Sequence, residues 1–572
     1  MKQVVLVTAA LVAAVAVWGV VLPPARLVLP SSWDDGSVRG IVHVHSRTSD
    51  GRGTLDEIAA AAARARLQFV VVTDHGDASR RPEPPSYRSG VLLLDAVEIS
   101  TRGGHYVALG LPQAPYALGG EAADVVEDVR RLGGFGVAAH PDSPKPELRW
   151  QDWSAPVDGV ELINPDTSWR VHAFAGGVAS KWLLLRALLA YPVRPAESIA
   201  QLFTDNQSLR ARWTEAAATR TVVALAGADA HAKLAMRDTE PGDNSSSVPI
   251  PSYDSSFASL SVHVVPVRPF TRDAAADAAA LLGGLRAGHI YVAVDGWASP
   301  AAFTFSASRG DRVALAGDTL AAGEPLTLQV RSNAPAGWPT NVWKGTARIA
   351  ERTEPVFDLP VSGEPAFYSV EVRKSGQSGQ PAWLTSNPIY VRDPRVSALA
   401  TQPDPVYVDG QSLFDGRTTK GWSWEGDATS QAAVDFAPLV TGARVRLRYG
   451  LSGGAKVGQY AAAAVDTPRG AADAAGVRFL VRGDAPMRIS LQVRAEVPGF
   501  QPERWERSVY LDATESERTV RFSDMHPVGK THSPKPPVGA IRSIMFVVDT
   551  TNSLPGSSGR LWLGAARLVR AK

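Results

Sequence analysis

The chain has 572 residues, which is more than one hydrophobic core usually covers, so we expect about three or four domains. Hydrophobic residues make up 45% and charged residues 20% of the chain, as in ordinary globular proteins and unlike disordered or collagen-like ones. The formal net charge is +2 and no basic run stands out, so nucleic acid is not expected as a partner. Cysteine is absent, which excludes disulfide bonds, a thiolate nucleophile and Cys-type zinc sites.

An uncharged apolar stretch covers residues 4–22. Its length is close to the roughly 20 residues that a bilayer-spanning helix needs. We therefore expect residues 1–30 to be a membrane anchor or a signal peptide, with Ala14-Val15-Ala16 as the candidate cleavage site of a signal peptide. In both cases the rest of the chain is predicted to be extracytoplasmic, either membrane-anchored or secreted into the periplasm or cell envelope. A chain without cysteine avoids unwanted oxidation there.

From residue 38 to about 300, apolar strands alternate with helical segments. The first helix opens with a capping box, in which Thr54 is followed three residues later by Glu57. Such alternation predicts a mostly parallel α/β barrel or wound sheet. The predicted strands are 41–45, 68–75, 90–100, 105–111, 135–140, 157–164 and 221–231, and the predicted helices are 54–67, 121–134 and 179–190.

After residue 300 the pattern changes to short strands separated by proline and glycine turns. We expect a small β-sandwich over 301–393, a linker over 394–410 and a jelly-roll-like β-sandwich over 411–572. The last region resembles galactose-binding-like or carbohydrate-binding jelly rolls, and it contains Trp422, Trp424, Trp505 and Trp562. These rings either stack on sugars, which would give a glycan or cell-wall contact, or fill the core of the sandwich.

Histidines occur where the predicted strands end. His43 and His45 alternate within the first strand, so their side chains are expected on one face. His75, His140 and His231 end or follow three other strands. The C-terminal ends of barrel strands form one face, so these side chains should meet in one pocket. Three carboxylates and a further histidine extend the set, namely Asp50, Glu98, Asp229 and His105.

Six histidines and three carboxylates exceed what one metal ion takes, which is usually three or four protein ligands and water. Glu98 is the candidate to bridge two ions, because a carboxylate has two oxygens. The segments HVH…SDG, VVVTDHG, VEIS…GGHYVALGL, AAHP and GADAH resemble, in this order, the motifs of the PHP (polymerase and histidinol phosphatase) superfamily of metallohydrolases, in its CehA/McbA-like branch. The resemblance covers about 38–300 and implies a distorted (β/α)7 barrel, followed here by C-terminal β-sandwich domains.

The resemblance also implies which residues hold each ion. One ion would be held by His43, His45, Glu98 and Asp229, a second by Glu98, His105 and His140, and a third by Asp50, His75 and His231. Some relatives have histidine where this chain has Asp50. An oxygen ligand there favours iron or manganese over zinc and weakens the third site. We expect two or three divalent ions, which are zinc, manganese or iron.

The function implied is metal-dependent hydrolysis of a small phosphoester, with a water bridged by two cations as the nucleophile. The expected catalytic residues are Glu98, Asp229 and His231, and the expected substrate-binding cations are Arg47 and Lys145. The same site would also hydrolyse a carboxyl or carbamate ester. A surface glycan-binding protein with an inactive barrel is the other alternative. Ser46 has no histidine left for a catalytic triad, and His172, His263 and His289 are interpreted as structural.

Overall fold

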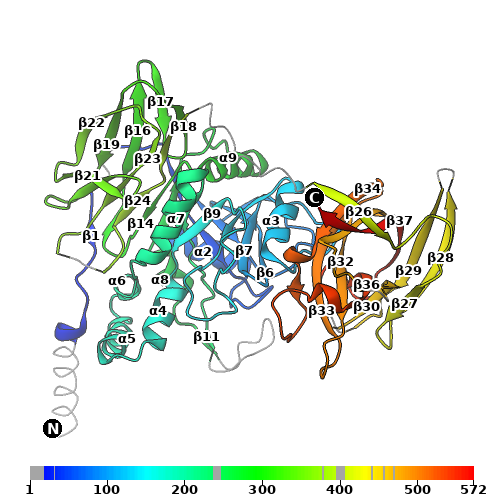
Figure 1. Cartoon of the computed structure of the whole chain (residues 1–572). Coiled ribbons are helices and arrows are strands. Elements are labelled where there is room, and N and C mark those ends of the chain that lie inside the picture. The colour runs from blue at the N-terminus through cyan, green and yellow to red at the C-terminus, as the bar shows by residue number, and fades with distance from the viewer. Residues whose placement is uncertain are drawn as a thin grey trace, which may run out of the picture. The chain divides into compact units, whose positions relative to one another are not determined.

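The computed structural model describes residues 18–572, except 31–32, 236–246, 377–378, 394–405, 440–441, 455–457 and 468–469 (Figure 1). The chain divides into two compact units. Unit 1 comprises residues 1–77, 81–112 and 126–399, and unit 2 comprises residues 78–80, 113–125 and 400–572. Most of the predicted signal or anchor, residues 1–17, lies outside the described residues, as does most of the predicted linker. Among the described residues, no helix is both long and apolar enough to cross a membrane.

Unit 1 contains a closed ring of strands. β2 pairs in parallel with β3, and a second sheet has the order β10-β9-β8-β7-β6. Two isolated parallel bridges, His75 with Glu98 and Val44 with Ala230, join the ends of these strands and close the ring. The strands of the ring are β2 (Val38–Val44), β3 (Phe69–Val72), β6 (Val97–Thr101), β7 (Gly104–Leu109), β8 (Phe135–Ala138), β9 (Gly159–Ile163) and β10 (Val223–Ala226).

Helices connect β2 to β3, β7 to β8 and β9 to β10, as the alternation in the sequence predicts, whereas the connections from β3 to β6, from β6 to β7 and from β8 to β9, all within the described residues, contain none. α2 begins at Leu55, where the predicted capping box is present: Thr54 accepts from the backbone of Glu57, whose side chain accepts from the backbone of Thr54. Gly133, with φ 89°, follows α3. The helices described between residues 38 and 300 are α2 (Leu55–Arg64), α3 (Ala122–Arg131), α4 (Pro165–Phe174), α5 (Val178–Ala190), α6 (Pro195–Ala200), α7 (Gln207–Thr219), α8 (Tyr253–Phe257) and α9 (Ala274–Ala287), and the first four residues of α3 belong to unit 2.

The predicted single strand over 90–100 is wrong, because the structure has two strands there in different sheets. β5 (Val91–Asp95) continues the sheet of β2 and β3, whereas β6 belongs to the second sheet. The backbone N–H of Ala96 still donates to Val72 at 2.7 Å, but the N–H of Glu98 donates to Asp74 at 3.2 Å, beyond the end of β3. This change of sheet puts Glu98 at the end of the strands, where the histidines lie.

Residues 301–393 form short strands, as predicted, but they do not form a separate domain. One of their sheets has the order β17-β16-β19-β22. The other is continuous with the sheet of β2, because β24 (Leu384–Ser386) pairs with β14 (Ile290–Ala293). One hydrophobic core therefore runs through both regions. The further strands are β13 (Ser261–Val264), β16 (Phe303–Arg309), β17 (Arg312–Leu315), β18 (Thr319–Ala321), β19 (Leu326–Ser332), β20 (Thr340–Lys344), β21 (Ala347–Arg352), β22 (Val356–Val361), β23 (Ala366–Val372) and β25 (Ile389–Arg392).

Unit 2 is a β-sandwich of two six-stranded antiparallel sheets, as predicted for 411–572. Its core includes Phe479 and Phe546, whose rings meet edge to face at 5.0 Å. Residues 113–125 also belong to this unit, and Arg507 donates to the buried carboxylate of Asp124 at 2.6 Å. One sheet contains β28 (Gln431–Leu439), β29 (Gly442–Gly450), β37 (Ser558–Ala571), β31 (Gly476–Gly483), β34 (Ser516–Arg521) and β26 (Tyr407–Ser412), and the other β27 (Trp422–Gly426), β30 (Tyr460–Asp466), β36 (Ile541–Asp549), β32 (Met487–Ala495), β33 (Glu503–Leu511) and β35 (His526–Pro527).

Candidate metal centre

The ends of the ring strands bring all nine metal-ligand candidates together. In each of four overlapping groups, the candidate ligand atoms lie within 4.8 Å of one another. Three of the candidates, His43, His140 and Asp229, have positive φ values of 65°, 28° and 47°. Non-glycine residues rarely adopt such angles, and the strain is typical of functional sites. The groups are His45, Asp50, His75 and His231; His43, Glu98 and His140; His43, His45 and Asp229; and His75, Glu98 and His105.

Four atoms at the centre of the cluster have the spacing of ligands around one ion. The Nε2 atoms of His43 and His45 each lie 3.2 Å from Oε2 of Glu98. The same two nitrogens lie 3.5 Å and 3.4 Å from Oδ1 of Asp229. Ligands at about 2.0–2.1 Å from a tetrahedral zinc ion are roughly 3.3–3.4 Å apart. The first ligand set implied by the sequence resemblance therefore has the geometry of a metal site.

Glu98 also faces the second predicted ligand set. Its Oε1 atom lies 2.7 Å from Nδ1 of His105 and 2.8 Å from Nε2 of His140. The antiparallel hairpin of β6 and β7 sets this arrangement, because Ser100 pairs with His105 and Glu98 pairs with Val107. Both oxygens of one buried carboxylate thus face histidines, which is the arrangement that a bridging ligand needs.

The third predicted set lies at the outer edge of the cluster. Oδ2 of Asp50 lies 3.2 Å from Nε2 of His231 and 3.7 Å from Nε2 of His75. The Nδ1 atom of His45 adds a 3.4 Å approach to Asp50, so the geometry groups His45 with this set as well as with the first. Asp50 is 46% exposed at its side chain, whereas Glu98 is buried. This outer set is therefore more open to solvent than the central one.

Several buried ligand atoms have no hydrogen-bond partner within the protein. They are Nε2 of His43, Nε2 of His45, Oε2 of Glu98 and Nδ1 of His140. An unpaired polar atom in the interior costs about 1–3 kcal/mol, and the first three of these atoms lie together, with both histidine nitrogens 3.2 Å from Oε2 of Glu98, which is rare unless something else satisfies them. The donor set of imidazoles and carboxylates suits zinc, manganese or iron. The residues present therefore fit the divalent ions that the sequence analysis implies.

The pKa values of these groups indicate that the carboxylates make the electrostatic potential at the cluster negative. Burial lowers the pKa of His231, but Asp50 and Asp229 outweigh it and raise the pKa to about 10. Burial likewise acts against the pKa of His140, which Glu98 raises to about 9. Burial opposes ionisation of Glu98, yet the neighbouring histidines hold its pKa well below the usual range. Positive charge is strongly favoured here, whether it is carried by protons or by metal ions.

Glu161 is a central residue of the site that the sequence did not reveal. Its Oε1 atom lies 2.6 Å from Nδ1 of His43, and its Oε2 atom accepts from the backbone N–H of His140 at 2.7 Å and from Asn164 at 3.0 Å. A carboxylate on the far nitrogen of a ligand histidine fixes its ring and tautomer. The signal was only that Glu161 interrupts the apolar strand β9.

Asp74, next to His75, anchors the loop that follows β2. It accepts from the backbone of Ser46 at 2.8 Å, from the Ser46 hydroxyl at 2.5 Å and from the Ser49 hydroxyl at 2.6 Å. The Ser49 hydroxyl lies 3.4 Å from Nδ1 of His45. Asp74 thus reaches a ligand histidine through Ser49, and it also accepts a hydrogen bond from the hydroxyl of Ser46.

A pocket of about 450 Å³ opens beside the cluster. Asp50, Asp229 and His231 lie at one part of its wall, and the cations Lys145, Arg170 and Lys233 also line it. Of the two cations expected to bind substrate, Lys145 is therefore at the pocket. Arg47 is exposed and is absent from the lining. The remaining wall is mostly apolar and comes from α4, α5, α6 and the segment near Ile250.

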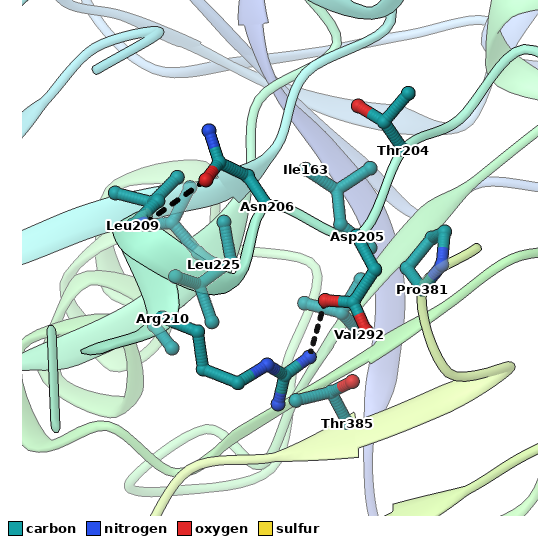
Figure 2. A pocket seen from close by; sticks show the side chains of 12 residues that line it. Ile163, Thr204, Asp205, Asn206, Leu209, Arg210, Leu225, Val292, Pro381 and Thr385 are labelled. Carbon is teal, nitrogen blue, oxygen red and sulfur yellow. Dashed lines mark hydrogen bonds and ion pairs between the residues drawn. The ribbon is translucent and has the colours of Figure 1, made fainter. Parts of the chain in front are cut away.

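A second hollow in unit 1 is too small for a substrate. Figure 2 shows it between Ile163, Leu225 and Val292, with the Arg210 side chain reaching Asp205 at 3.1 Å. Its volume is about 20 Å³, which is space for about one water molecule. Its ion pairs join α7 to the strands of the small sandwich, so we interpret this hollow as structural.

Three of the four tryptophans of unit 2 are buried or half-buried, and Trp505 belongs to its hydrophobic core. Trp505 and Trp562 are buried, and Trp422 is half-buried and stacks on Phe546 at 5.8 Å. Trp424 is the exception, because 54% of it is exposed. Of the four rings considered as sugar-stacking candidates, one is therefore available at the surface.

No family model and no curated protein matches the chain. Solved structures similar to parts of it include the family 11 carbohydrate-binding module of the cellulosomal cellulase Lic26A-Cel5E of Clostridium thermocellum, at 17% identity and a TM-score of 0.25, covering 29% of this chain and 96% of that one. A carbohydrate-binding module TmCBM27, described for mannan recognition, is 11% identical with a TM-score of 0.20, and the match covers 29% of this chain and 99% of that one. TM-scores this low support no functional conclusion.

Proposed function

We propose that the chain is a metal-dependent hydrolase of the PHP type, acting on phosphoesters. The observation that carries this proposal is the central quartet of His43, His45, Glu98 and Asp229, whose ligand atoms have metal-site spacing and include three buried atoms without a partner. The closed ring of strands, with the cluster at the strand ends, supports the proposal, because barrel enzymes carry their active sites there.

The residues of the chain divide the work of the site. Divalent ions bound there would lower the pKa of a water molecule toward neutrality and offset the charge that develops on the substrate. Glu161 and Asp74 hold the ligand histidines in orientation. Lys145 and Lys233 also line the pocket, where Arg170 is paired with Asp166; with metal ions bound to the carboxylates of the cluster, these cations would attract an anionic group, which favours a phosphoester over a neutral ester.

Metal analysis and one ligand substitution test this proposal. Purified protein should contain about two or more divalent ions per chain. His43→Ala should abolish turnover of phosphomonoesters and phosphodiesters in a screen with zinc, manganese and iron. His172→Ala, on α4 outside the cluster, is the matched control and should retain both metal and turnover. A chain that binds no metal under any reconstitution would refute the proposal, and turnover of carboxyl or carbamate esters alone would assign it to ester hydrolysis.

A serine hydrolase is the second candidate, and one contact favours it. The Ser100 hydroxyl lies 3.3 Å from Nε2 of His105, whose Nδ1 lies 2.7 Å from Glu98. This is the order of groups in a nucleophilic triad. Ser100→Ala separates the two mechanisms: it should leave turnover nearly unchanged in the metal-dependent enzyme, and it would abolish turnover if Ser100 were the nucleophile.

A further inference from the structure

The helix α5 is apolar around its circumference and yet largely exposed. Its sequence is VASKWLLLRALLA, in which Ala187 and Ala190 are the buried residues. Trp182 is 53% exposed and Leu188 is 57% exposed. A helix that is hydrophobic on all sides is normally buried, so α5 needs a cover. Other exposed apolar side chains of the same region are Phe174, Val178, Leu185, Leu189 and Val193.

The N-terminal apolar stretch leads directly to α5. Arg186 of α5 donates to the backbone carbonyls of Val21 at 2.8 Å and Leu22 at 3.2 Å. The indole N–H of Trp18 donates to the carbonyl of Leu189 at 3.2 Å. Figure 1 shows this end of the described chain beside α5. The uncharged stretch of residues 4–22 therefore ends on the exposed apolar helix.

The same helix forms part of the pocket beside the metal cluster. Leu184 and Leu188 of α5 line the pocket together with Trp169, Ile199 and Leu202. Asp229, His231 and the three cations line the same pocket. One cavity thus combines polar groups suited to a phosphoester with apolar side chains that belong in part to the exposed helix α5.

From this combination we infer that α5 lies in the surface of a lipid bilayer and that the pocket takes an amphiphile. The phosphoester headgroup would bind at the cluster, and the hydrocarbon chain would run along Leu184 and Leu188. The substrate class rests on the proposed phosphoesterase function, which it narrows to phosphoesters with a long apolar chain. At 13 residues, α5 is too short to span a bilayer and is suited to lie in its interface.

A lipid surface explains this patch better than a protein partner does. Trp18 and Trp182 lie on it, and tryptophan prefers the boundary between hydrocarbon and headgroups. Lys181 and Arg186 add cations, which anionic headgroups attract. Trp18, Val21 and Leu22, at the end of the uncharged sequence 4–22, contact α5, and that sequence has the composition of a membrane segment.

The absence of cysteine allows a direct test of contact with lipid. Single variants Leu185→Cys on α5 and Val313→Cys on β17 carry the same environment-sensitive fluorophore, in the full-length protein in phosphatidylcholine–phosphatidylglycerol vesicles. Val313 is a matched control, because it is 63% exposed and belongs to the small sandwich. We expect a blue-shifted emission and several-fold stronger quenching by acyl-chain nitroxides at 185 than at 313. Equal quenching at the two positions would overturn the inference. A blue-shifted emission at 185 in the absence of vesicles, or one that depends on protein concentration, would also overturn it, because another part of the protein or a second copy would then cover α5.

A binding series tests the apolar wall without requiring turnover. Butyl, hexyl and octyl phosphonates, which are not hydrolysed, are titrated into the metal-loaded protein. Each two added methylene groups should tighten the Kd about tenfold while the chain still contacts the wall. Leu188→Asp should remove this gain, and Val313→Asp should keep it. A Kd independent of chain length would refute the amphiphile. If the protein turned over no phosphoester, the proposed function would fail, but the fluorescence experiment would still test contact of α5 with lipid and the binding series would still test the apolar wall.

Discussion

Glu161 is expected to control metal affinity without touching a metal ion. It accepts from His43, from the backbone of His140 and from Asn164. Glu161→Gln keeps the size of the side chain but removes the charge that orients His43. We predict a loss of metal affinity of about 10–100-fold, with the fold intact, measured by competition with a fluorescent chelator. Glu215→Gln, on the exposed face of α7, is the control and should bind metal normally; unchanged affinity in Glu161→Gln would show that His43 needs no such support.

His263 predicts a pH dependence of stability away from the metal cluster. It stacks on Tyr291 at 4.3 Å, and burial lowers its pKa to about 4 although Asp35 and Asp295 act in the opposite direction. The folded state therefore keeps His263 neutral, while the unfolded chain takes up a proton below pH 6.5. Above pH 6.5 His263 therefore does not lower the free energy of unfolding. As the pH drops from 6.5 toward about 4, protonation of His263 in the unfolded chain lowers the free energy of unfolding by about 3 kcal/mol at most.

His263→Gln should make the decline of the urea unfolding midpoint between pH 7 and pH 4.5 shallower than in the unchanged protein. The histidines of the cluster titrate in both proteins, so the difference between the two slopes isolates His263. Parallel slopes for His263→Gln and the unchanged protein would contradict the assignment.

Among the single residues, the ligand candidates could be predicted from the sequence because they share a position, the end of a strand, and metal-binding side chains. Glu161 shares the chemistry but not the position: it lies within the apolar strand β9, and its role depends on the approach of its side chain to His43 of β2 and to the backbone of His140 after β8. Arg170 and Trp169 became visible only once α4 was folded beside the pocket. Contacts between distant segments leave no local pattern, so residues that act through another side chain are the ones that sequence reasoning misses.

Among the elements, the hairpin of β6 and β7 positions Glu98 and His105 on either side of one tight turn. Gly104 has a φ of 112°, and a Cβ atom there would lie 2.5 Å from the carbonyl oxygen of Arg149. Gly104→Ala should therefore displace His105, lower the number of bound ions, and reduce the free energy of unfolding by about 1–3 kcal/mol. Elemental analysis and urea unfolding measure the two effects.

Gly90→Ala is the matched control for this hairpin. Gly90 also has a positive φ, 78°, but no atom lies within 4 Å of a Cβ placed there. It should share the backbone strain and keep the full complement of metal. Equal metal loss in both variants would mean that strain alone, rather than the collision near Arg149, disturbs the site.

The elements that local chemistry defines were predicted, and those that depend on sheet pairing were not. The capping box of α2 and the glycine after α3 are properties of a few consecutive residues, and both are present. The strand over 90–100 breaks at Ala96 because β5 and β6 pair with different partners, which an unbroken apolar run does not reveal. The bulge in β2 at His43 has the same origin, since it arises where β2 pairs with β3.

In the whole molecule, the sequence pattern changes near residue 300 from alternating strands and helices to short strands. The structure shows the same change, but residues on both sides of it belong to unit 1. A hydrophobic strand such as β24 has the same sequence pattern whether it belongs to a separate sandwich or extends a neighbouring sheet. Here β24 pairs with β14 and extends the sheet of β2. The sandwich of unit 2, by contrast, has its own core of side chains such as Phe479 and Trp505. The two units therefore differ in what metal removal can affect.

All nine ligand candidates belong to unit 1, so chelation should loosen that unit alone. A ligand at a hundred times its Kd stabilises the folded state by about 2.7 kcal/mol, which is about a hundredfold in the population of open states. After removal of metal, amide hydrogen exchange in β2 and β6–β10 should become up to about a hundredfold faster. The full increase is expected for amides that exchange only when the local opening also separates the metal ligands. The strands β29, β32, β36 and β37 of unit 2 should exchange at unchanged rates. Acceleration spread evenly over both units would mean that the metal stabilises the chain through coupling of the units, and no change in β2 would place the ions outside the cluster.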